Sequence, residues 1–192
     1  MRWIFFLIVT YLTLSIQSGL SSLLVINNDV TPSLLLILGV FVSVYAPQTT
    51  TLWAMLLLGV LTDLMYPIQG AGPVSDFVLV GPNAVGFMIG GWAALQLRGI
   101  FRRSIPGIVA TVLVVCFFVE LVVVAAMTVR GLPWPVAQPL EGWSAADELV
   151  RRFWCMLYTT LLSIPVIYLL GGLQRLFHFD TSRSGQSGYV LR

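Results

Sequence analysis

Asp63 and Glu120 are the carboxylates that lie inside apolar runs of the sequence. An ionised side chain in such a run costs a few kcal/mol on membrane-insertion scales, so each one needs a partner or a function. One interpretation makes them parts of a polar site that binds a proton, a cation or a partner's arginine. The other makes Asp63 a helix-end residue bonded to backbone or loop, and Glu120 a buried hydrogen-bonded residue or half of a private ion pair.

The segment from Leu56 to Asp76 surrounds Asp63 with small and helix-breaking residues. Gly59 lies one turn before Asp63 on the same helical face, where it lets a neighbouring backbone come close. The stretch from Pro67 to Pro73 cannot continue a helix, so the chain must turn or re-enter there. Asn83 is placed to hydrogen-bond to Asp63 or to this broken stretch. We therefore predict a partner-binding or structural polar site made of Gly59, Asp63, Asn83 and Glu120.

The sequence carries no recognisable catalytic motif. It lacks HExxH, GxSxG and a glycine-rich phosphate loop, and its single histidine, His178, lies in the polar tail. Cys116 and Cys155 stand in apolar runs without CxxC or histidine spacing, which indicates small buried hydrophobic residues rather than a redox or metal site. We predict that the protein is not an enzyme and binds no metal or cofactor.

The composition indicates an integral membrane protein. Of the 192 residues, 58% are hydrophobic and 9% are charged, against roughly 25% charged residues in soluble domains, and the mean hydropathy is +0.93. The net charge of +2 is too small to suggest a nucleic-acid partner. We predict one transmembrane domain over residues 1–175 and a polar cytoplasmic tail over residues 176–192.

Apolar runs separated by polar or proline-rich breaks predict an all-α, polytopic membrane bundle of about six transmembrane helices. The first run starts at Trp3, and we interpret it as an uncleaved helix rather than a signal peptide because later segments are also apolar. The second run, 34–46, is either a short helix shielded by its neighbours or one extended past Pro47, since about 14 residues span only about 21 Å. The remaining runs are 50–66, 77–97, 105–129 and 153–173.

Two of these runs carry local signals of packing or helix boundaries. Gly86, Gly90 and Ala94 recur every four residues, which predicts a small-residue ridge for close helix contact. Ser144, followed three residues later by Asp147, resembles a capping box that starts the last helix. Pro165 then marks a place where that helix can kink.

The arginines predict the orientation, because positive residues concentrate in cytoplasmic loops. With six spans and the N-terminus inside, the cytoplasmic arginines outnumber the external ones by seven to three. Both termini are therefore expected in the cytoplasm. The cytoplasmic group is Arg2, Arg98, Arg102, Arg103, Arg175, Arg183 and Arg192, and the external group is Arg130, Arg151 and Arg152.

The order of these features resembles MreD, the membrane component of the bacterial rod-shape and cell-wall elongation machinery. The resemblance covers Met1 to Arg103 and rests on helix count thereafter. The chain departs from the family at Ser33, where an acidic residue often follows the proline, and in a less regular loop over 69–73. The matching segments are Met1-Arg2-Trp3 with a helix to Gln17-Ser18-Gly19-Leu20, Thr31 to Leu36, Leu58 to Asp63, and a Pro67 to Gly70 loop before a glycine-bearing helix that ends in arginines.

The resemblance implies a non-catalytic scaffold in the bacterial inner membrane, similar in architecture to the six-helix substrate-binding subunits of vitamin transporters. It implies binding to MreC, and through it a link from RodA-type and penicillin-binding synthases to the actin-like MreB filament. Apart from these proteins, only membrane lipid is expected as a partner. The alternative is a transporter subunit that binds a vitamin or metal ion near Asp63, Asn83 and Glu120. An intramembrane enzyme is a third reading, disfavoured because no nucleophile and base pair is visible.

Overall fold

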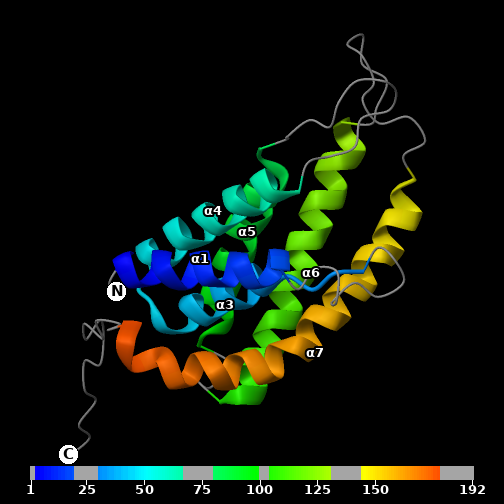
Figure 1. The fold of residues 1–192 in the computed structure, drawn as a ribbon. Coiled ribbons are helices and arrows are strands. Elements are labelled where there is room, and N and C mark those ends of the chain that lie inside the picture. Colours follow the sequence, from blue (N-terminus) through cyan, green and yellow to red (C-terminus); the bar gives the residue numbers. More distant parts are fainter. Residues whose placement is uncertain (1–2, 20–29, 67–79, 100–103, 131–143, 178–192) are drawn as a thin grey trace, which may run out of the picture.

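The computed structural model describes residues 3–19, 30–66, 80–99, 104–130 and 144–177, and within these ranges it is all-helical (Figure 1). The all-α prediction is confirmed for this part of the chain. Residues 178–192 of the predicted tail, and the segments 67–79 and 131–143, lie outside the described residues. The first two residues of the predicted tail belong to the last helix. The helices are α1 (Trp3–Gly19), α3 (Leu34–Tyr45), α4 (Gln48–Met65), α5 (Pro82–Leu97), α6 (Ile105–Arg130) and α7 (Ala145–Phe177).

Helix α3 forms the centre of the core. It has 12 residues, and all of them except Tyr45 are buried. It contacts α1, α4, α5, α6 and α7. At a rise of 1.5 Å per residue, α3 is about 18 Å long. Because it stops at Tyr45 and does not continue past Pro47, the first of the two alternatives for this run is correct: α3 is a short helix enclosed by its neighbours.

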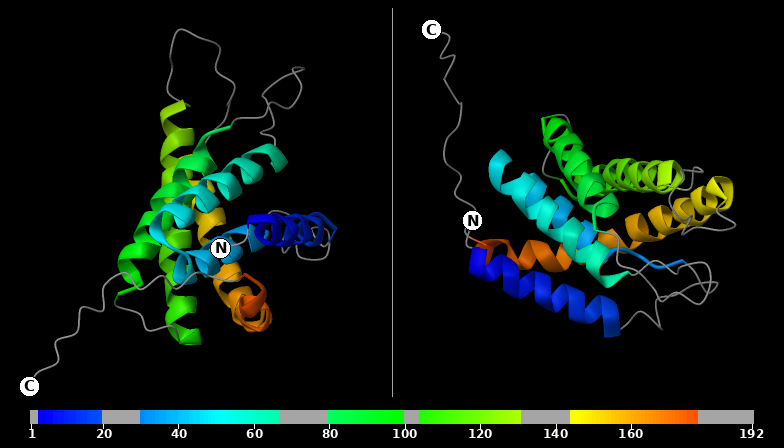
Figure 2. Two further views of the ribbon diagram at one scale, coloured as in Figure 1. Left: turned by 90° about the vertical axis from the view of Figure 1, so that its left-hand side faces the viewer. Right: turned by 90° about the horizontal axis from the view of Figure 1, so that it is seen from above.

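The other helices surround α3. Helix α5 packs between α4 and α6, and α6 also packs along α7. Helix α1 contacts α3 and α7, and it lies at the edge of the molecule, on the side away from α5 and α6 (Figure 2).

Proline and serine mark the starts of two helices, and α5 begins at Pro82 rather than at the start of the predicted run 77–97. Pro82 occupies the first turn of α5. A backbone N–H at this position has no partner within the helix, so proline, which lacks that group, costs no hydrogen bond here. Ser144 precedes α7, and its Oγ accepts a hydrogen bond from the Asp147 N–H at 3.4 Å, the serine half of the expected capping box. Helix α7 continues without a break through Pro165 and bends along its length (Figure 1).

The predicted ridge on α5 packs against α6. A Cβ added at Gly86 would lie 3.2 Å from the Val119 carbonyl oxygen, and one added at Gly90 would lie 2.9 Å from a methyl carbon of Val115. Ala94 is 1% exposed. The small residues therefore let the two helices come closer than larger side chains would allow.

Two of the described helices are long and apolar enough to cross a membrane, over Ile105–Val129 in α6 and Ala145–Gly172 in α7. Helices α1 and α3 are apolar but shorter. The described part of the chain is thus all-helical, with two helices that are long and apolar enough to span a membrane. The six-span bundle stays a prediction.

Candidate functional site

The Asp63 carboxylate caps the N-terminus of α5. Its Oδ2 accepts hydrogen bonds from the backbone N–H groups of Gly81 (2.8 Å) and Ala84 (3.1 Å). Its Oδ1 accepts from the backbone N–H (3.1 Å) and the side-chain Nδ2 (2.9 Å) of Asn83. Asp63 is only 3% exposed. A negative charge at this position is favoured because the first N–H groups of a helix have no intrahelical partner and carry the positive end of its dipole.

Gly59 brings the α5 backbone within reach of Asp63. A Cβ at position 59 would lie 2.6 Å from Ala84 Cα and 2.7 Å from the Asn83 carbonyl oxygen. Only a residue without a side chain permits this approach, which confirms the predicted role of Gly59. Gly81 has φ +144°, a conformation that side chains rarely allow, and it turns the chain so that its N–H faces the carboxylate.

Gln17 performs a similar capping role for α3. Its Oε1 accepts hydrogen bonds from the backbone N–H groups of Leu34 (3.1 Å) and Leu35 (3.3 Å), and its Nε2 donates to the Tyr66 hydroxyl at 2.7 Å. Gln17 is 5% exposed. Gln17 was not among the site residues predicted from the sequence, although a single amide near the end of an otherwise apolar run indicates a buried polar contact.

The two ends of α3 are held by several other helices. At the start, the Ser33 backbone N–H donates to Thr159 Oγ1 on α7 at 3.1 Å, and Ser33 Oγ accepts from Leu36 N–H at 3.3 Å. At the end, Arg98 Nη1 donates to the Ala46 carbonyl oxygen at 2.7 Å. The first backbone N–H groups of this short, buried helix are therefore satisfied by Gln17 and Ser33, and Arg98 binds the carbonyl group of the residue that follows it.

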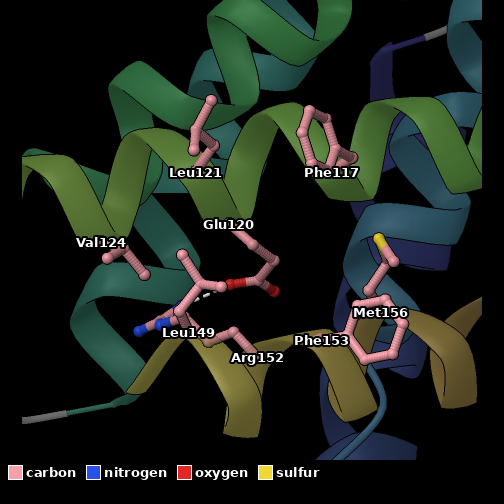
Figure 3. Close-up of a pocket in the computed structure, with 8 residues that line it drawn as sticks. All are labelled: Phe117, Glu120, Leu121, Val124, Leu149, Arg152, Phe153 and Met156. Carbon is pink, nitrogen blue, oxygen red and sulfur yellow. Dashed lines mark hydrogen bonds and ion pairs between the residues drawn. The ribbon is translucent and has the colours of Figure 1, made fainter. Parts of the chain in front are cut away.

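Glu120 on α6 forms an ion pair with Arg152 on α7 (Figure 3). Arg152 Nε also donates to Glu148 at 2.6 Å, and Glu148 in turn accepts from Arg151 Nε at 2.9 Å. The ion pair lines a cavity of about 70 Å³ that is otherwise apolar. The cavity's lining residues are Phe117, Glu120, Leu121, Val124, Leu149, Arg152, Phe153 and Met156.

The four residues of the predicted site therefore separate into two places. Gly59, Asp63 and Asn83 meet at the junction of α4 and α5, which we call the α4–α5 joint. Glu120 instead belongs to the α6–α7 ion pair, which is the alternative in which it pairs with another residue of the same protein. Its partner Arg152 was expected in an external segment, so the sequence offered no reason to pair the two.

The chemistry of the α4–α5 joint is that of a structural cap. Its carboxylate accepts four hydrogen bonds from three residues at the α5 start, Gly81, Asn83 and Ala84. Among the residues that the structure describes, no group of three or more His, Cys, Asp or Glu side chains is arranged to hold a metal ion. Cys116 is buried and Cys155 is partly exposed, and both are free thiols.

Comparisons with protein families, with curated proteins and with solved structures find no match to this chain.

Proposed function

We propose that this protein is a membrane scaffold of the MreD type, which binds MreC and helps to link peptidoglycan synthases to the MreB filament. The observation that carries the proposal is the α4–α5 joint. Leu58 to Asp63 is one of the segments that resemble MreD, and it fixes two helices against each other through backbone contact at Gly59 and four hydrogen bonds to Asp63. A rigid arrangement of helices is what a non-catalytic scaffold needs in order to present a binding surface.

In this proposal the chain is a six-helix protein of the bacterial inner membrane with both termini in the cytoplasm. Support comes from the two long apolar helices and from large apolar side chains that are exposed on the outside of several helices. Lipid or a membrane partner covers such surfaces. Examples are Ile8 on α1, Trp92 on α5, Phe117 on α6 and Leu161 on α7.

The transporter-subunit alternative has less support from the described residues. Asp63 and Asn83 are bonded to each other, and the cavity beside Glu120 measures about 70 Å³, whereas pockets for small organic ligands occupy about 300–1,000 Å³. A larger open groove of about 400 Å³ lies between α6 and α7, near Val109 and Ile164, but none of the three predicted ligand residues lines it.

The proposal is tested by purifying the tagged protein from its native membranes in a gentle detergent and identifying bound proteins by mass spectrometry. We expect to recover MreC together with elongation synthases. Recovery of an ATPase pair and a membrane coupling subunit, or of a tightly retained small molecule, would contradict the scaffold and establish the transporter.

A further inference from the structure

In the proposed membrane arrangement, the Glu120–Arg152 ion pair lies at a depth where lipid does not solvate it. Glu120 is 15 residues from the start of α6 and 10 from its end, which corresponds to about 22 Å and about 15 Å along the helix axis. If the hydrocarbon layer of about 30 Å is centred on α6, Glu120 sits about 10 Å inside it. Charged groups at that depth are costly unless protein groups or water surround them.

The ion pair is nevertheless partly open to the outside. The side chains of Glu120 and Arg152 are 22% and 19% exposed. Large apolar side chains surround them on both helices and are themselves well exposed (Figure 3). These rim residues are Phe117 (52% exposed), Leu121 (45%), Leu149 (50%) and Phe153 (50%). We call this surface the ion-pair face.

The charge and the cavity volume of the ion-pair face indicate which side chain of a partner can bind there. Within this ion-pair network the two acids, Glu120 and Glu148, are balanced by the two bases, Arg151 and Arg152. The cavity of about 70 Å³ has room for about two water molecules, at about 30 Å³ each, or for one small side chain. A neutral hydrogen-bonding group of that size satisfies the pair without adding charge.

We propose that the ion-pair face binds one apolar transmembrane helix of a partner protein, with a Ser, Thr, Asn or Gln side chain of that helix inserted beside Glu120 and Arg152. The apolar rim packs against the flanking apolar residues of the partner helix, and the central polar side chain provides the hydrogen bond that a lipid tail lacks. This inference rests on the proposed function, in which the partner is MreC.

Site-specific photo-crosslinking in native membranes tests this proposal. We would replace Phe117 and Phe153, one at a time, by p-benzoylphenylalanine, an aromatic residue of similar shape. Matched controls carry the same probe at Trp53 on α4 (63% exposed) and Trp92 on α5 (56% exposed). We expect the two ion-pair-face positions to crosslink to the MreC transmembrane helix at least tenfold more efficiently than the controls.

A variant pair tests the same face without a probe. Leu121→Trp adds bulk to the rim and is expected to reduce the recovery of MreC at least tenfold. Ile8→Trp, on the distant α1 and similarly exposed (51%), is expected to leave recovery unchanged. Size-exclusion profiles identical to the unmodified protein establish that both variants fold.

The outcomes separate this inference from the proposed function. If MreC co-purifies but crosslinks only from Trp53 or Trp92, the ion-pair face is the wrong surface and the scaffold proposal stands. Crosslinks from Phe117 and Phe153 to lipid alone, or to a second copy of this chain, also overturn the inference. If MreC does not co-purify with the unmodified protein, the proposed function itself fails.

Discussion

Replacing Gly59 by alanine should separate α4 from α5. The added Cβ would lie 2.6 Å from Ala84 Cα, 2.7 Å from the Asn83 carbonyl oxygen and 3.0 Å from the Ala84 nitrogen. All three are backbone atoms, so no side-chain rotation relieves the contact. An ordinary contact begins at 3.4 Å, and the difference from 2.6 Å requires a separation of about 0.8 Å.

That displacement would also weaken the hydrogen bonds to Asp63. They now measure 2.8 to 3.1 Å, and a shift of about 0.8 Å along them gives about 3.6–3.9 Å, beyond hydrogen-bonding distance. Overpacking alone costs about 1–3 kcal/mol, and a hydrogen bond to a charged group contributes about 1.5–3 kcal/mol. Because the helices will relax to the arrangement of lowest free energy, these costs do not simply add. We expect the free energy of unfolding to fall by about 3 kcal/mol, which lowers the unfolding midpoint of a chain this size by about 6–12 °C.

The assay is thermal unfolding of the purified protein in detergent, followed by the loss of the monodisperse size-exclusion peak. Gly171→Ala in α7 is the matched control, because a Cβ there meets nothing within 4 Å. It should leave the midpoint unchanged or raise it slightly, since alanine favours a helix over glycine. A Gly59→Ala midpoint within about 2 °C of the unmodified protein would refute the argument that this glycine is required for backbone contact.

Three further predictions concern buried hydrogen bonds, the ion pair and the exposure of the two cysteines. Gln17→Leu removes the acceptor that caps α3 and should cost about 2 kcal/mol of stability; an unchanged unfolding midpoint contradicts this. In a double-mutant cycle on Glu120 and Arg152, both changed to alanine, thermal unfolding should give a coupling of about 1 kcal/mol, and strict additivity would mean that the pair contributes nothing. In detergent, a maleimide should label the partly exposed Cys155 at least tenfold faster than the buried Cys116, as read by mass spectrometry; equal rates would contradict the described packing.

Helix starts and close helix contacts can be predicted from the sequence where they depend on residues near each other in the chain or on one residue type. Ser144 marks the start of α7 because the effect of a capping serine is local. The start of α5 at Pro82 was not predicted, because the apolar run 77–97 begins before it. The α4–α5 joint was also predictable, because glycine and an acid one turn apart require a close backbone and a donor. Asn83 was the predicted donor, and the backbone N–H groups of Gly81 and Ala84 donate as well.

Contacts between distant helices were not predictable in the same way. Arg152 is 32 residues from Glu120, and Gln17 is 49 residues from Tyr66, so no local periodicity relates them. The hydrogen bond from Arg98 to the Ala46 carbonyl at the end of α3 joins residues 52 apart in the sequence and was likewise not predicted. Such pairings depend on how helices are arranged in space, which one sequence alone does not specify.

The most direct test of the scaffold role is depletion of the protein in its native cells, with new wall synthesis followed by a fluorescent D-amino acid. We predict that the rods widen and become round within a few generations, and that labelling along the side wall is lost. Cells that keep their rod shape and labelling pattern, but lose uptake of a nutrient, would contradict the scaffold and establish a transport role.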